Sequence, residues 1–319
     1  MSSNFSVIIP VHNKLPHLER SISSVLNQTL PDFELILVDD ASTDGSSEKL
    51  LEFQDPRIKL LKRDIPGPGG YAARNLGIKN ASYDWICFLD ADDEWETDVL
   101  ETICNIMSND TSVDVLCWGW MNVKDGTMYK DKYSTKYQNE PIRKYTLTDF
   151  FKQPQPMWTG SISMKKELLE KAGGFPEEGF KRGGDMDTWI RCLWHSHKNL
   201  RLTRSMTYYH LDSVNMVTNS IEKDISFSFS VFVEYILQNT HDKKLIKTIR
   251  KFQNRRIYTV LRERVNQGKG IDYDLLFKMN RTFTFYYLSM KLHLKRLFIE
   301  TKSSKIFPRI NSNIRGHAN

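Results

Sequence analysis

The first half of the chain alternates short apolar runs with helical patterns, and this alternation restricts the chain to few folds. The apolar runs cover residues 6–11, 33–38, 58–62 and 85–89. Between them, apolar residues recur at helical spacing, as in residues 15–26. Strands separated by helices of this length form βαβ units, whose parallel strands are buried on both faces. We therefore predict an α/β fold with a mixed, mostly parallel sheet flanked by helices.

The charge of the chain changes toward its carboxyl end. Residues 241–319 contain 19 lysines and arginines against 5 acidic residues, whereas residues 1–240 contain 26 against 34. We predict a first, α/β domain over residues 1–220 and a basic, helical C-terminal region over residues 221–319. A strongly basic region favours an anionic partner.

Two apolar stretches lie among these basic residues. One is a stripe at positions 245, 249, 252, 257 and 261, and the other covers positions 283, 285–288 and 292 beside Lys291, Lys295 and Arg296. Apolar and basic faces side by side are typical of helices that lie on an anionic membrane. The same stretches also fit packing on the first domain or on a second copy of the chain, so a homodimer is a further candidate. A nucleic-acid partner is not expected, because no recognised motif accompanies the charge.

The sequence indicates a cytoplasmic protein, peripheral at most to the inner face of the plasma membrane. It has no run of about 18 uncharged apolar residues, the length that spans a bilayer. Its amino terminus lacks the pattern of a signal peptide. The four cysteines form no C-x-x-C pair and are expected to be reduced and buried.

An acidic cluster follows the fourth apolar run, with Asp90, Asp92, Asp93 and Glu94 directly after residues 85–89. An apolar strand cannot bury such a cluster, so the carboxylates belong at its end. Two aspartates one residue apart can hold one hard divalent cation and leave positions free for phosphate oxygens. The alternative is a polar loop whose last acid caps the next helix.

The first βα turn, residues 10–14, contains no glycine. A Rossmann dinucleotide site and a P-loop both need glycines at this point, so that the backbone can approach phosphate. A classical dehydrogenase or a P-loop NTPase is therefore not expected.

Three further residues have both a functional and a structural interpretation. Asp39 ends the second strand and can accept a hydrogen bond from a base or a ribose, although it can also serve the turn. Arg74 can bind phosphate or pair with an aspartate at a strand end. Asp185 begins a helix after several glycines, where it is either a helix N-cap or a general base carried by a mobile loop.

Taken together, and in this order, seven segments resemble an inverting family 2 glycosyltransferase of the GT-A fold. The resemblance covers about residues 5–215 and leaves residues 220–319 outside it. The matching segments are residues 6–13, 37–46, 73–77, 88–93, 159–161, 173–175 and 184–189.

The resemblance implies a role for each matching residue. It puts Pro10, His12, Asn13 and Asp39 in the nucleoside pocket, and Arg74 near the base or the diphosphate. It makes Asp90 and Asp92 the D-x-D pair that binds Mn²⁺ or Mg²⁺, with Asp92 the more direct ligand and His210 a further ligand near the diphosphate. Asp185 becomes the catalytic base, and Asp187 a further substrate-binding candidate.

Two departures from the family pattern stand out. The family usually has tyrosine where this chain has His12, which alters stacking on the base. It usually has glutamate where this chain has Gly184, which puts the acceptor contacts in doubt.

We therefore expect a metal-dependent transferase that moves a sugar from a UDP-sugar to a hydroxyl of a glycan or a lipid-linked acceptor in cell-surface polysaccharide synthesis. One alternative is a sugar-phosphate nucleotidyltransferase, although such enzymes usually carry a glycine-rich loop after the first strand. The other is a non-catalytic sugar-nucleotide-binding protein, to which Gly184 gives some weight.

Overall fold

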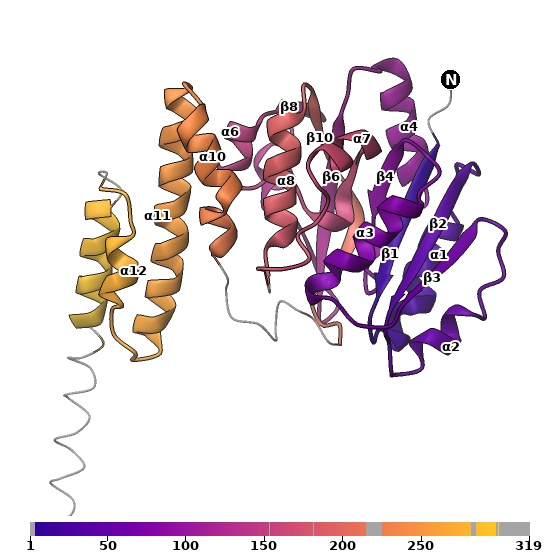
Figure 1. Ribbon diagram of the computed structural model, residues 1–319, viewed down its shortest axis with the longest axis horizontal. Helices are drawn as coiled ribbons and strands as arrows, with labels where there is room; N and C mark the ends of the chain where they lie inside the picture. The colour runs from indigo at the N-terminus through magenta and orange to yellow at the C-terminus, as the bar shows by residue number, and fades with distance from the viewer. Residues whose placement is uncertain are drawn as a thin grey trace, which may run out of the picture. The chain divides into compact units, whose positions relative to one another are not determined.

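The computed structural model describes residues 4–152, 154–180, 182–214, 225–281, 285–297 and 299. The chain forms two compact units, Met1–Val233 and Glu234–Asn319 (Figure 1). The predicted boundary between residues 220 and 221 lies outside the described residues and stays a prediction.

The first unit is built on one sheet, whose main path runs in the spatial order β3-β2-β1-β4-β9-β6-β10-β5, with β7 beside β6 and β8 beside β10. The strands are β1 (Phe5–Val11), β2 (Phe33–Asp40), β3 (Ile58–Arg63), β4 (Trp85–Phe88), β5 (Glu94–Trp95), β6 (Val115–Lys124), β7 (Thr127–Lys130), β8 (Ile142–Tyr145), β9 (Ile162–Lys165) and β10 (Asn199–His210).

The four strands predicted from the apolar runs form the parallel part of this sheet. The pairs β3–β2, β2–β1 and β1–β4 are all parallel, and the register pairs Val11 with Asp39 and Ile8 with Phe88. Strand β9 then joins β4 and β6 in antiparallel directions, which makes the sheet mixed. The predicted α/β fold class is confirmed.

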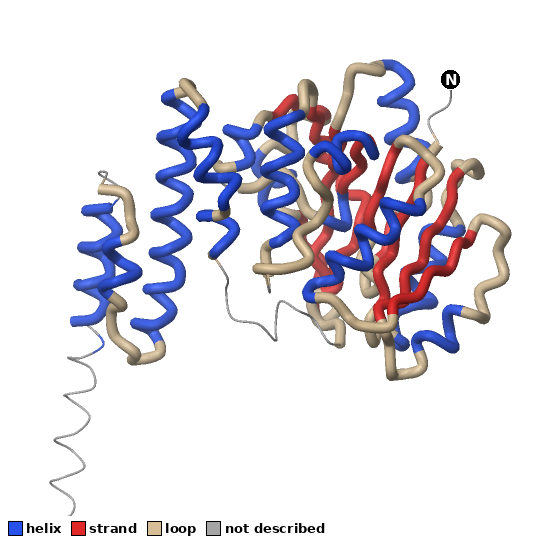
Figure 2. Tube along the Cα trace, in the orientation of Figure 1, coloured by secondary structure: helices blue, strands red, loops and turns tan. Residues whose placement is uncertain are grey.

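Helices cover both faces of the sheet (Figure 2). The helices of the first unit are α1 (Leu18–Leu26), α2 (Ser46–Leu50), α3 (Tyr71–Asn80), α4 (Val99–Asn109), α5 (Lys132–Lys136), α6 (Leu147–Phe150), α7 (Lys166–Lys171) and α8 (Gly184–His195). Short 3₁₀ turns are η1 (Leu15–His17), η2 (Pro68–Gly70), η3 (Thr159–Ser161) and η4 (Ser226–Phe229).

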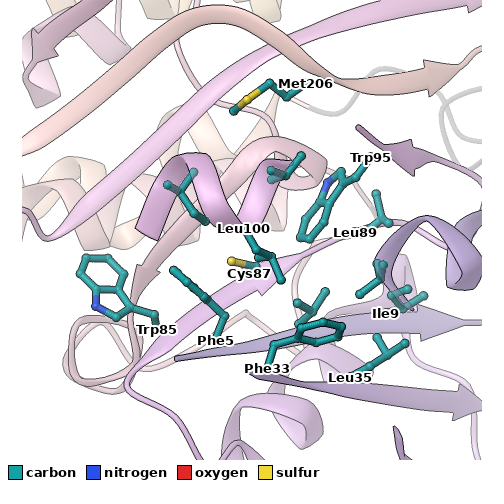
Figure 3. Close-up of a cluster of buried hydrophobic side chains, with 14 of the residues drawn as sticks. Phe5, Ile9, Phe33, Leu35, Trp85, Cys87, Leu89, Trp95, Leu100 and Met206 are labelled. Carbon is teal, nitrogen blue, oxygen red and sulfur yellow. The ribbon is translucent and has the colours of Figure 1, made fainter. Parts of the chain in front are cut away.

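A hydrophobic core cluster lies between the sheet and helices α1 and α4 (Figure 3). Alternate residues of the parallel strands point into it, such as Phe5 and Ile9 of β1, Leu35 of β2 and Cys87 of β4. The residues between them point to the opposite face, where Ile8 lies against Gly77 of α3. Because both faces are buried, the strands are apolar throughout, which is why the sequence predicts them well. All four cysteines are free and buried, as predicted.

The segment 121–145, which is polar and has no regular apolar pattern in the sequence, forms a surface hairpin only in part. Strand β6 extends to Lys124 and forms a hairpin with β7. The rest of the segment enters the unit, because β8 pairs with β10 and Tyr133 and Tyr145 are buried. Strand β10 itself, which pairs with β6 in parallel, was not predicted.

The second unit is helical, as predicted, with α11 (Lys243–Asn266), α12 (Tyr273–Phe277) and a helix over residues 285–297. Helix α10 (Val231–Asn239) precedes α11. Asn254 of α11 donates a side-chain hydrogen bond of 2.8 Å to the carbonyl of Asn280, and its Oδ1 accepts one of 2.8 Å from the Asn280 amide. None of the helices in the described ranges has the length and apolar character needed to span a bilayer.

Candidate active site

The carboxyl ends of three parallel strands bring the predicted site residues together. Residues 12–14 follow β1, Asp39 and Asp40 end β2, and residues 89–93 follow β4. Strands β1 and β2 pair through Val11 and Asp39, and β1 and β4 pair through Ile8 and Phe88. Ligands of open α/β sheets bind at this edge, outside the carboxyl ends of the strands.

The loops after β1 and β2 hold each other in place. A ring nitrogen of His12, Nδ1, lies 2.7 Å from the carbonyl oxygen of Asp40, which makes it a donor. Oδ1 of Asn13 accepts a 2.8 Å hydrogen bond from the amide of Thr43, and Asn13 itself adopts a left-handed φ of 52°. Pro10 precedes this turn near the end of β1. These hydrogen bonds fix the positions of the two loops relative to each other, and the loops carry residues predicted for the nucleoside pocket.

Asp39 is buried and supports its own turn. Its Oδ1 accepts a 3.0 Å hydrogen bond from the amide of Ser42, and its Oδ2 accepts one from the hydroxyl of Ser47. A carboxylate oxygen has two lone pairs, so each oxygen can still accept a second bond. Binding of a base or ribose by Asp39 stays a prediction.

Asp90 and Arg74 form an ion pair at the end of β4. Arg74 is buried on α3, where its Nη2 donates to Oδ1 of Asp90 and its Nη1 donates to the carbonyl of Gly69 at 2.8 Å. Of the two interpretations of Arg74, the pairing with a strand-end aspartate is the one present in this structure. Cζ of Arg74 also lies over the ring of Phe175, 5.6 Å from the ring centroid.

Asp92 pairs with a lysine that we did not predict. Nζ of Lys14 lies 2.6 Å from Oδ2 of Asp92 and also donates to the carbonyl of Val214 at 2.8 Å. Both charged side chains are largely buried. The neighbouring Asp93 is fully buried, and burial together with the charges of Asp92 and Asp90 raises the pKa of its carboxyl well above the usual range.

Asp185 lies in the first turn of α8. This helix begins directly after Gly183, which has a φ of 86°. Oδ2 of Asp185 accepts a 3.3 Å hydrogen bond from the hydroxyl of Thr159. Burial raises the pKa of Asp185 above its usual value; the charge of Asp90 also raises it, whereas that of Arg74 lowers it. Helix α3 connects Asp185 to the Arg74–Asp90 pair, because Tyr71 of α3 accepts a hydrogen bond from the amide of Gly184 and Arg74 of α3 pairs with Asp90.

Gly184, the main departure from the family pattern, is enclosed. A Cβ atom at this position would lie 2.8 Å from the ring of Tyr71 and 2.9 Å from Cγ of Pro176. The hydroxyl of Tyr71 accepts a 2.9 Å hydrogen bond from the amide of Gly184. Burial and the charge of Asp185 raise the pKa of Tyr71 to about 12, so the phenol stays protonated. Tyr71 thus occupies the space that a side chain at 184 would need.

Two predicted site residues have other partners. Nε2 of His210 lies 2.9 Å from Oε1 of Glu94, and its amide donates to Oδ1 of Asp93 at 2.9 Å. His210 is thus hydrogen-bonded to the acidic loop, and its partners there are Glu94 and Asp93. Asp187 points along α8, where its Oδ2 accepts a 2.8 Å hydrogen bond from Nε of Arg191. Their predicted roles, metal binding and substrate binding, stay predictions.

The acidic loop has a donor set that suits a hard cation. Asp90 and Asp92 offer carboxylate oxygens, the ligands that Mg²⁺ and Mn²⁺ prefer. Asp92 already contacts one cation, the ammonium of Lys14. Within the described ranges no three histidine, cysteine or acidic side chains converge on one point. The residues therefore fit a divalent ion that takes its other ligands from a phosphate, provided that Lys14 moves away from Asp92.

Sequence reasoning missed Lys14, Tyr71 and Thr159. Lys14 directly follows the predicted pocket residues, and its position beside them was the one available signal. Thr159 opens a segment that we matched to the family without assigning it a role. For Tyr71 the signal was indirect, because a missing side chain at 184 leaves a space that another residue has to fill.

Comparison with known proteins shows the family to which the chain belongs. The model of the family "Glycosyl transferase family 2" matches residues 6–173. Because the match covers more than half of the 319 residues, the chain belongs to this family and is a glycosyltransferase. The family match favours this activity over a nucleotidyltransferase or a non-catalytic binding protein.

Two curated relatives and one solved structure illustrate the similarity. The putative teichuronic acid biosynthesis glycosyltransferase TuaG of Bacillus subtilis is 34% identical over 230 residues, which cover 69% of this chain and 81% of TuaG. The UDP-Glc:alpha-D-GlcNAc-diphosphoundecaprenol beta-1,3-glucosyltransferase WfgD of Escherichia coli is 44% identical over 102 residues, which cover 32% of this chain and 40% of WfgD.

The solved structure is that of S. aureus TarS in complex with UDP-GlcNAc. It superimposes with a TM-score of 0.71 at 17% sequence identity and covers 95% of this chain and 92% of the TarS chain. At this identity the likeness concerns the fold, which is the predicted GT-A type.

Proposed function

We propose that this glycosyltransferase is a metal-dependent, inverting enzyme that transfers a sugar from a UDP-sugar to a hydroxyl of a glycan or a lipid-linked acceptor. The observation that carries the proposal is the connection of Asp185 to the acidic strand end through helix α3. Tyr71 of α3 accepts a 2.9 Å hydrogen bond from the amide of Gly184, the residue before Asp185, and Arg74 of the same helix pairs with Asp90. This connection supports one site that contains both a base and a leaving-group site.

The names of similar proteins support the class of substrates. TarS has been crystallised with UDP-GlcNAc and with UDP. WfgD is named as using UDP-Glc and a diphosphoundecaprenol-linked sugar, and TuaG as acting in teichuronic acid biosynthesis. The TarS and WfgD names have a UDP-sugar in common, which supports a UDP-sugar donor. The lipid-linked sugar in the name of WfgD and the biosynthesis named for TuaG support a lipid-linked or glycan acceptor.

In the proposed reaction Asp185 removes the proton of the acceptor hydroxyl. A hydroxyl is a poor nucleophile until a base takes its proton, and such a base accelerates a reaction by roughly 10²–10⁴-fold. Burial raises the pKa of Asp185, which makes its carboxylate a stronger base than an exposed aspartate. The Thr159 hydroxyl, 3.3 Å from Oδ2, holds the carboxylate in one orientation.

The acidic loop serves the other side of the reaction. A divalent cation held by Asp92 and Asp90 would neutralise the charge that develops on the leaving diphosphate. The Arg74 guanidinium orients the Asp90 carboxylate through their ion pair. With the base and the leaving group on opposite sides of the anomeric carbon, displacement is in line and the configuration at that carbon inverts.

Two substitutions test these roles. Asp185→Asn keeps the shape of the side chain but removes the base, so we expect turnover to fall by roughly 10²–10⁴-fold while UDP binding is retained. Asp92→Ala removes the cation ligand, so we expect loss of turnover together with loss of Mn²⁺-dependent UDP binding. Calorimetry with UDP and a UDP-release assay measure both quantities. Full activity of Asp185→Asn would overturn the assignment of the base.

A further inference from the structure

The helix over residues 285–297 is apolar on two opposite faces. Its inner face contains Leu288 and Leu292, of which 8% and 0% is exposed. Its outer face consists of apolar side chains that remain in contact with water: Tyr286 63%, Tyr287 42%, Met290 56%, Leu294 58% and Leu297 57% exposed. At about 100° of rotation per residue, these outer positions fall within an arc of about 100°. We call them the outer face.

Helix α12 extends this apolar surface. Tyr273 contacts His293 of the 285–297 helix, with ring centroids 6.1 Å apart, and its ring also lies 6.3 Å from that of Phe277. Phe277 and Tyr273 are both among the exposed large apolar residues. An exposed aromatic and aliphatic surface of this kind marks an interaction site more often than a solvated one.

The surroundings of the outer face are basic. The segment 285–297 contains Lys291, Lys295 and Arg296 and no acidic residue. Nζ of Lys291 lies 4.5 Å from the ring centroid of Tyr287, so one cation lies directly at the border of the outer face. The whole region 241–319 contains 19 basic residues against 5 acidic ones.

The apolar stripe predicted on α11 is a different surface. Its residues at 245, 249, 252, 257 and 261 are all buried, so they belong to the packed interior and offer no free face. The membrane-binding role that we considered for that stripe is therefore assigned to the outer face of the 285–297 helix.

We propose that the outer face of the 285–297 helix binds an anionic lipid surface. Tyrosines, methionine and leucines would enter the boundary between headgroups and acyl chains, where aromatic rings with a polar end are favoured. Lys291 and its basic neighbours would contact the anionic headgroups. A second copy of the chain fits less well, because it would bring two basic helices together. This inference does not depend on the proposed reaction.

Vesicle co-sedimentation of the full chain tests the inference without donor or acceptor present. We expect the chain to sediment with vesicles of phosphatidylcholine and phosphatidylglycerol, to bind far less to phosphatidylcholine alone, and to be released by salt. The double substitution Met290→Ser and Leu294→Ser removes apolar area from the outer face and should weaken binding about tenfold or more. Replacing Lys291 and Lys295 by glutamine should weaken it about fivefold for each cation.

The matched control is Leu51→Ser with Met128→Ser, which removes two apolar side chains of similar exposure from the first unit. We expect this control to bind vesicles as the unchanged chain does. Absence of sedimentation with anionic vesicles at low salt would overturn the inference, as would equal binding by the outer-face variant and the control. A lipid-independent dimer in analytical ultracentrifugation, lost in the outer-face variant, would also overturn it and assign the face to a second copy.

Discussion

The ammonium of Lys14 lies 2.6 Å from Oδ2 of Asp92, which joins the loop after β1 to the acidic loop after β4. Because both side chains are largely buried, each charge depends on the other for compensation. Asp92 is also the residue proposed to bind the divalent cation. If Asp92 binds the cation as proposed, Lys14 and the cation would compete for its carboxylate.

Substituting Lys14 by methionine should make the protein more responsive to metal. Without its partner, Asp92 is a partly buried charge, so we expect the metal-free variant to lose roughly 1–3 kcal/mol of unfolding free energy. Added Mn²⁺ restores the missing positive charge, so it should raise the melting temperature of the variant more than that of the unchanged chain. Thermal unfolding with and without Mn²⁺ measures both effects.

Lys49→Met is the control for this experiment, because Lys49 pairs with Glu19 and Glu52 at the surface. It removes the same charge far from the acidic loop and should leave the response to Mn²⁺ unchanged. If Lys14→Met and Lys49→Met respond alike, Lys14 does not compete with the cation.

The pH dependence of turnover should report the ionisation of Asp185. A base has to be deprotonated, so activity falls as the pH drops through its pKa, which burial raises above the usual 3.8. The Thr159 hydroxyl lowers that pKa by its hydrogen bond to the carboxylate. Thr159→Val removes this bond at nearly constant volume, so the acidic limb of the kcat profile should move to higher pH.

Ser161→Ala provides the comparison for Thr159→Val. Ser161 lies in the same 3₁₀ turn and is also buried, and its hydroxyl has no hydrogen-bond partner in the part of the chain that the structure describes. This variant should keep the acidic limb where it is. A profile that shifts equally in both variants would point to a general disturbance of the turn.

Gly184→Ala tests whether helix propensity or packing has the larger effect on stability at this position. In a helix, alanine is favoured over glycine by about 1 kcal/mol. At this position, however, the added Cβ would lie 2.8 Å from the Tyr71 ring, and overpacking of this kind typically costs about 1–3 kcal/mol. We expect a net loss of stability in urea unfolding, and recovery of part of it when Tyr71→Leu makes room. A more stable Gly184→Ala protein would contradict the packing that we describe.

The sequence predicted the parallel half of the sheet because its strands are buried on both faces and therefore apolar throughout. Strand β10 was not predicted, because its segment is not apolar throughout. Its segment contains Arg201 and Arg204, which are unusual in a central strand. Arg201 is nevertheless fully buried, with Nη2 3.3 Å from Oδ1 of Asp131. A pattern of apolar residues cannot reveal a strand whose charges are compensated by a distant segment.

The same limit applies to the site. Strand ends indicated where Asp39, Asp90 and Asp92 lie, because the carboxyl ends of parallel strands meet at one edge. Which cation accompanies each aspartate depends on packing between segments far apart in sequence. Lys14 and Asp92 are 78 residues apart, so their pairing was not accessible from local patterns.

The central claim of the account is that Asp92 and Asp90 bind a cation that in turn binds the diphosphate of the donor. A crystal structure with Mn²⁺ and UDP, recorded at a wavelength where manganese scatters anomalously, tests it most directly. We predict an anomalous peak within coordination distance of Asp92, bridged to the UDP phosphates, with the Lys14 ammonium displaced from its position 2.6 Å from Oδ2. UDP bound elsewhere, or bound at this edge with Lys14 still paired to Asp92 and no anomalous peak, would contradict the account.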